Sequence, residues 1–207
     1  GDNGKTGKSL DFPIMTCHPS APCQECYAAE AYARAAHNRR HIRNLIALLQ
    51  DPKGMGRRVA EEAMTQPAQD LKFVRIFGAG DMTMTEMVDA FNELAQHLDR
   101  PIHIFSRHHH NLRKLKSGPN STWRRMASVD AELFDVYGVE WLRENARLGI
   151  ANAWLYTDES EISAMETLLD NDALGVVLAA SHDLYEGLPE HLRMVNCPCD
   201  AGERSFA

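Results

Sequence analysis

Short apolar runs alternate along this chain with longer amphipathic patterns, and this alternation limits the fold more than any other feature. The runs most typical of strands are Leu71–Phe77, Pro101–Phe105 and Ile150–Tyr156. The stretches between them carry apolar residues at helical spacing. Strands that alternate with helices favour a parallel sheet whose faces are covered by the helices. We therefore expect an α/β fold with a parallel sheet of about six strands.

The remaining elements are expected in the same alternating order. Phe12–Thr16 predicts the first strand, and a helix follows from about residue 25 to residue 50. Thr83 and Glu86 have the spacing of a capping box, which predicts a helix start. The other predicted helices and strands are, in chain order, Arg57–Met64, Trp123–Val129, Ala131–Leu148 with a break near Gly138, Glu159–Asp170, Leu174–Ala179 and Arg193–Asn196.

Size and composition indicate one well-packed domain. The chain has 207 residues, of which 44% are hydrophobic and 25% charged, so we expect a single α/β domain over 1–207. Its last part, 192–207, is expected to be a cysteine-bearing C-terminal tail that is cut short here. No apolar stretch approaches the roughly 20 residues that span a membrane.

Charge and cysteine usage limit the partners and the compartment. The net charge of −7 argues against tight, non-specific binding to nucleic acid. A local basic groove and a solvated helix face both remain open for six cations: Arg107, Arg113, Lys114, Lys116, Arg124 and Arg125. Five cysteines are an odd number, and their clustering suits metal binding in a reducing cytoplasm better than disulfides.

Three of these cysteines lie between the first expected strand and the helix after it. Cys17, Cys23 and Cys26 have the spacing C-x5-C-x2-C. Thiolates select iron–sulfur clusters, zinc or copper(I). The C-x-x-C pair can turn both sulfurs toward one metal, and the electropositive start of a helix suits an anionic thiolate–metal centre. We therefore expect a metal on these three residues.

One interpretation leaves the fourth coordination position open. A [4Fe–4S] cluster on three thiolates can bind S-adenosylmethionine, as in radical S-adenosylmethionine enzymes, which have a partial (β/α) barrel. Their usual spacing is C-x3-C-x2-C, so the first interval here is two residues longer. Functional groups of such folds gather at the carboxyl ends of the strands. There we expect Gly78, Gly80 and Asp81 to hold the methionyl end, with Ser106 and Arg107 as weaker candidates for the carboxylate or ribose.

The other interpretation fills the fourth position with a late cysteine. Cys197 or Cys199, in NCPCD, would complete a closed zinc site and make the chain a zinc-stapled structural or binding module. The two could instead begin a second cluster site. Cys197 and Cys199 therefore keep both the metal and the function open.

Several segments together resemble the phage "gene product 88" family. They are N-x-K-T-G at 3–7, TCHPSAPCQECYA, FVRIFGAGD and the terminal NCPCD. Members are cysteine-rich phage or prophage proteins similar to radical S-adenosylmethionine proteins. The resemblance implies a cluster on Cys17, Cys23 and Cys26, and a cysteine-rich tail that continues past Cys197 and Cys199. Such an enzyme would work in the bacterial host cytoplasm and take electrons from a flavodoxin- or ferredoxin-type donor. A phage setting suggests a nucleotide or nucleic-acid substrate.

Other patterns give weaker signals. Gly7-Lys8-Ser9 ends like a phosphate-binding loop but lacks the preceding strand and glycine. His108-His109-His110 is expected to be a polar loop. His37 and His41 lie one helical turn apart among arginines, which favours a solvated basic helix face.

Overall fold

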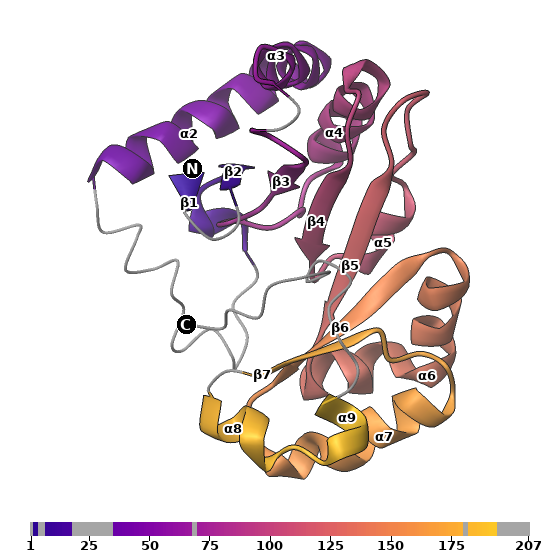
Figure 1. The fold of residues 1–207 in the computed structure, drawn as a ribbon. Helices are drawn as coiled ribbons and strands as arrows, with labels where there is room; N and C mark the ends of the chain where they lie inside the picture. The colour runs from indigo at the N-terminus through magenta and orange to yellow at the C-terminus, as the bar shows by residue number, and fades with distance from the viewer. Residues whose placement is uncertain (1, 4–6, 18–34, 68–69, 180–181, 194–207) are drawn as a thin grey trace. The chain divides into compact units, whose positions relative to one another are not determined.

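The computed structural model describes residues 2–3, 7–17, 35–67, 70–179 and 182–193, and the chain divides into two compact units (Figure 1). The first unit is Gly1–Arg125 and the second is Met126–Ala207. Both contain parallel strands and helices in alternation, which confirms the α/β class. Within the described part of each unit the strands do not close into a barrel.

The strands of the first unit follow one another in the sheet in chain order. Their bounds are β1 (Asp2–Asn3), β2 (Gly7–Leu10), β3 (Val74–Ile76) and β4 (Ile102–Ser106). Strand β1 pairs with β2 in antiparallel fashion, and β2, β3 and β4 are parallel. Strand β5 (Trp123–Val129) starts in this unit, directly after the Thr122 carbonyl accepts a hydrogen bond from the Ile102 amide at 2.9 Å.

The described part of the first unit contains four α-helices: α2 (Ala35–Gln50), α3 (Pro52–Met64), α4 (Thr85–His97) and α5 (His109–Arg113). Helix α3 starts where the Asp51 side chain accepts a hydrogen bond from the Gly54 amide at 2.9 Å. Asp51 is the N-cap and Pro52 is pre-organised for the first helical turn. Ile76 and Ile104 of the sheet and Phe91 of α4 are all buried, and Phe91 packs edge-on against Phe77, which follows β3.

The second unit contains the end of β5, β6 (Ile150–Tyr156) and β7 (Val176–Ala179), the last two paired in parallel. Its helices are α6 (Ala131–Arg147), α7 (Ile162–Asp170), α8 (His182–Gly187) and α9 (Glu190–Arg193), and a 3-10 turn, η3 (Glu159–Glu161), precedes α7. Trp154 and Tyr156 are fully buried in its core together with Leu142 and Met165.

Several predicted elements are confirmed in place. Strands β5 and β6 have the predicted bounds. The break expected in α6 is at Gly138, whose φ of 70° and ψ of 170° lie outside the helical region. The later part of the first predicted helix is α2, while its part before residue 35 lies outside the described residues. No described helix is long and apolar enough to cross a membrane.

Three local predictions are wrong. The strand predicted at Phe12–Thr16 is absent: strand β2 ends before it, at Leu10, and Ile14–Thr16 is a 3-10 turn, η1, because Pro13 has no amide hydrogen to donate to a ladder. The capping box is absent, since α4 starts at Thr85 and its N-cap, Met84, makes no side-chain hydrogen bond. Arg193 is the last residue of α9 rather than the start of a strand; residues 194–196 lie outside the described part.

Candidate site at the carboxyl ends of the strands

The structure brings the residues predicted after β3 and β4 into direct contact. The Ser106 hydroxyl donates a hydrogen bond to Asp81 Oδ1 at 2.5 Å, and the Arg107 amide donates to Asp81 Oδ2 at 3.2 Å. The Met82 amide also donates to Oδ1, at 2.7 Å. Asp81 and Ser106 are 6% and 2% exposed. The Asp81 carboxylate therefore joins the ends of two neighbouring parallel strands.

This network decides what the Asp81 side chain can do. A carboxylate has about four acceptor positions, and three donors of the chain already use three of them. The His108 ring lies 3.9 Å from Oδ2. The carboxylate is thus a buried group that positions the backbone of 81–82 and 106–107. A ligand at this site would contact the groups around the carboxylate rather than the carboxylate itself.

Cys17 lies beside the same network. Its amide donates a hydrogen bond to the Ile14 carbonyl at 2.8 Å, which places it directly after η1. The preceding residue, Thr16, accepts a hydrogen bond from the Asp81 amide at 3.1 Å and donates one to the Pro13 carbonyl at 2.8 Å. Cys17 itself is partly exposed. The first predicted metal ligand is therefore one residue away from a direct contact with the 78–81 turn.

Gly80 lets this turn approach the segment that carries Cys17. Its φ is +85°, a left-handed value that favours glycine. A Cβ at this position would lie 2.8 Å from Thr16 Oγ1, 2.9 Å from Phe12 Cβ and 3.0 Å from the Phe12 carbonyl oxygen. Both the conformation and the close packing therefore require glycine.

Asp11 anchors the other end of the turn, and the sequence patterns did not identify it. Its Oδ1 accepts hydrogen bonds from the amides of Gly78 at 2.7 Å and Ala79 at 3.2 Å, and Ser9 donates to Oδ2 at 2.8 Å. A Cβ at Gly78 would lie 2.7 Å from that same Oδ1, so the side chain and the turn fit only with glycine there. The sequence feature that could have identified Asp11 is its position as an acidic residue directly after strand β2.

The basic helix face predicted around His41 is wrong at that residue. His41 is 4% exposed, and its Nε2 lies 3.8 Å from Asp11 Oδ2. Asn44, one turn further along α2, donates to the Asp11 carbonyl oxygen at 2.7 Å. Helix α2 is therefore fixed to the residue that organises the 78–81 turn.

The predicted polar loop of three histidines and the predicted basic groove are only partly present. His109 is fully buried and begins helix α5. Arg125 is partly buried and donates to the Leu112 carbonyl at 3.4 Å, and burial lowers its pKa. Arg124 is exposed, and consecutive strand residues point to opposite faces. These two arginines thus do not share one groove.

The remaining predicted metal ligands are Cys23, Cys26, Cys197 and Cys199, and all four lie outside the described residues. Among the described residues, no three histidine, cysteine or acidic side chains come together as a metal site. Because only Cys17 of the proposed set is described, the three-cysteine centre stays a prediction.

The fold and this site define an α/β protein with a buried polar network where three parallel strands end. The family model described as Gene product 88 matches residues 4–202. The chain therefore belongs to the gene product 88 family, as the sequence motifs predict. No curated protein and no solved structure matches it.

Proposed function

We propose that this chain is an iron–sulfur protein of radical S-adenosylmethionine type. In this proposal Cys17, Cys23 and Cys26 hold a [4Fe–4S] cluster within a partial (β/α) barrel, and the chain works with an electron donor of flavodoxin or ferredoxin type. The observation that carries the proposal is the hydrogen bond from the Asp81 amide to Thr16. It holds Cys17 beside the turn that we expect to receive the cofactor.

The residues present fit these groups chemically. A thiolate is the ligand that iron–sulfur clusters require, and Cys17 is partly exposed at the edge of a polar network. Gly80 has no side chain at the point of closest approach to Thr16. When bound and reduced, the cluster would supply the electron for reductive cleavage of S-adenosylmethionine.

Each neighbouring group then has a distinct role. Asp81 positions the two strand ends through its hydrogen bonds to Ser106 and Arg107, so we assign it a positioning role. The backbone of Gly78 and Gly80 would face the methionyl end of the cofactor. The Arg107 side chain, directly after β4, would be a candidate to bind its carboxylate.

Anaerobic purification of the full chain tests the metal. We expect a brown protein that contains iron and sulfide and whose visible absorbance is bleached by dithionite. Cys17→Ser should abolish the colour, whereas Cys199→Ser should preserve it if the fourth position is open. A colourless protein with one zinc per chain, released by Cys197→Ser or by Cys199→Ser, would contradict the cluster and support the zinc-stapled module.

Addition of S-adenosylmethionine tests the second half of the proposal. The electron paramagnetic resonance spectrum of the reduced cluster should change on addition, and 5′-deoxyadenosine and methionine should accumulate. An unchanged spectrum with no product would leave a cluster-binding protein without this cofactor. Asp81→Asn should weaken the spectral response while iron content stays constant, because the substitution disturbs the turn and leaves the thiolates intact.

A further inference from the structure

The first unit carries a transverse row of polar side chains on one face of its sheet. The parallel register pairs Ser9 of β2 with Arg75 of β3, and Arg75 with His103 of β4. Laterally paired residues of neighbouring strands point to the same face. The next residues along, Leu10, Ile76 and Ile104, form the alternate row, and Ile76 and Ile104 are fully buried in the core.

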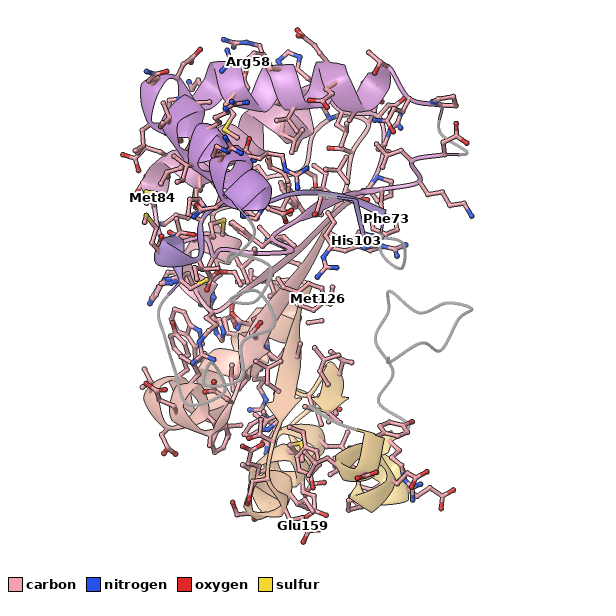
Figure 2. The ribbon with its side chains drawn as sticks, turned by 90° about the vertical axis from the view of Figure 1, so that its left-hand side faces the viewer. Arg58, Phe73, Met84, His103, Met126 and Glu159 are labelled. Atoms are coloured by element: carbon pink, nitrogen blue, oxygen red, sulfur yellow. The ribbon has the colours of Figure 1, made fainter. Side chains whose placement is uncertain are left out.

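An aromatic ring extends this row. Phe73 stacks on His103 with ring centroids 4.2 Å apart and an angle of 7° between the planes. Figure 2 shows these two side chains next to each other, on the other side of the strands from Met84 at the start of α4. The imidazole of His103 is 5% exposed, so its polar atoms sit in a largely dry, aromatic setting.

The part of the row around His103 has a positive setting, whereas Ser9 at its other end donates a hydrogen bond to the Asp11 carboxylate. Arg75 and Arg124 are the charged groups that act on His103, and both oppose its protonation, as burial does more strongly. Together these lower the pKa of His103 to about 4, so the ring is a neutral donor and acceptor near neutral pH. No carboxylate is among the described groups that shift it. Two cations thus act electrostatically on this ring in a chain whose net charge is −7.

We propose that Arg75, His103 and Arg124 of this row bind the phosphate group of a mononucleotide. Guanidinium groups bind phosphate through paired hydrogen bonds, and a tetrahedral phosphate accepts donors from more directions than a carboxylate. Neighbouring strands are about 4.8 Å apart, so side chains from β3, β4 and β5 can reach one anion. Phe73 offers an aromatic surface beside it.

A mononucleotide is favoured over nucleic acid by the charge of the whole chain. A net charge of −7 repels a polyanion, whereas one phosphate responds to the local cations. Binding of a nucleotide to the row does not depend on the proposed cluster chemistry. The further idea that this nucleotide is the substrate of that chemistry rests on the proposed function.

Binding of the common nucleoside 5′-monophosphates to the full chain tests this inference, with calorimetry on protein lacking iron. We expect saturable binding of at least one nucleotide, no comparable binding of the matching nucleoside, and competition by inorganic phosphate. Arg124→Gln, at an exposed position, should weaken binding by about tenfold or more. Arg58→Gln is the matched control, because Arg58 is an exposed α3 cation paired with Asp51, and it should leave affinity unchanged.

Three outcomes would overturn the inference. They are no saturable nucleotide binding, equal affinity for nucleoside and nucleotide, or equal losses in the Arg124 and Arg58 variants. A short single-stranded oligothymidylate that binds through Arg124 when no mononucleotide does would also overturn it, and would assign the row to nucleic acid. Nucleotide binding by a protein that never holds iron would sustain this inference while the proposed function fails.

Discussion

Replacement of Gly80 by alanine tests the packing between the 78–81 turn and the segment before Cys17. Gly80 has a φ of +85°, and Gly138 in α6 has a φ of +70°, so both substitutions place a Cβ in the left-handed region. Their surroundings differ. The Gly80 Cβ would lie within 3.0 Å of three atoms of Phe12 and Thr16, whereas nothing lies within 4 Å of the Gly138 Cβ. The pair therefore separates steric overlap from backbone strain.

The expected magnitudes follow from these two contributions. A left-handed alanine costs about 1–2 kcal/mol relative to a right-handed one, an alanine at the φ of 70° and ψ of 170° of Gly138 costs about 1–3 kcal/mol, and the lost freedom of the unfolded glycine returns about 0.4–1 kcal/mol. Gly138→Ala should thus lower the free energy of unfolding by about 1–2 kcal/mol. Overpacking of a closed site adds about 1–3 kcal/mol. Gly80→Ala should therefore cost about 2–4 kcal/mol.

Pulse-labelling hydrogen exchange in urea is the appropriate assay, because it reports each unit through its own peptides. Peptides of β2 and β3 report Gly80→Ala, and peptides of α6 and β6 report Gly138→Ala. Equal destabilisation by the two substitutions would refute the close packing of the turn against Phe12 and Thr16. A loss confined to the second unit in the Gly80 variant would refute its assignment to the first.

Three further substitutions test separate parts of the structure. Ser106→Ala removes a buried donor to Asp81 and should lower the free energy of unfolding by about 1–3 kcal/mol in urea titrations, whereas Ser160→Ala, at an exposed position, should have little effect. His103 has a folded pKa of about 4 against an ordinary 6.5, so its contribution to stability is complete above 6.5 and lost as the pH falls toward 4. The wild type should lose about 2 kcal/mol more than His103→Gln between pH values of about 7 and 5, and parallel curves would contradict the neutral ring. Asn152→Leu removes hydrogen bonds to the carbonyls of Leu142 and Ala173 and should cost about 2–4 kcal/mol in the second unit, measured by hydrogen exchange.

The convergence of residues at the strand ends could be predicted from the sequence because it depends on topology. Parallel strands place their carboxyl ends at one edge, so Asp81 after β3 and Ser106 after β4 were expected to be near each other. Their hydrogen bond agrees with that expectation. Strand β6 was predictable for a different reason, since a run of its length that is apolar apart from Asn152 is typical of a strand buried on both faces.

The anchors of the turn could not be predicted, because they depend on partners far apart in the chain. Asp11 binds the amide of Gly78, 67 positions away. Nothing in the local pattern around His41 indicates that its ring is buried next to Asp11, since the adjacent arginines are exposed. Periodicity predicts which face of a helix is apolar. It does not identify the polar residue, here His41, that becomes buried beside a carboxylate far away in the chain.

The two proposals concern different ends of the same strand, and they can be separated experimentally. His103 and Ser106 are three residues apart on β4, which corresponds to about 10 Å along a strand. Residues three apart on a strand point to opposite faces of the sheet, so the two proposed sites lie on different faces as well as at different positions along β4. Because the two sites share no residue, Cys17→Ser should abolish iron binding and leave nucleotide affinity unchanged, while Arg124→Gln should weaken nucleotide binding and leave the iron content unchanged. Loss of both properties in either variant would instead indicate that the substitution unfolds the first unit, which circular dichroism of the same samples would reveal.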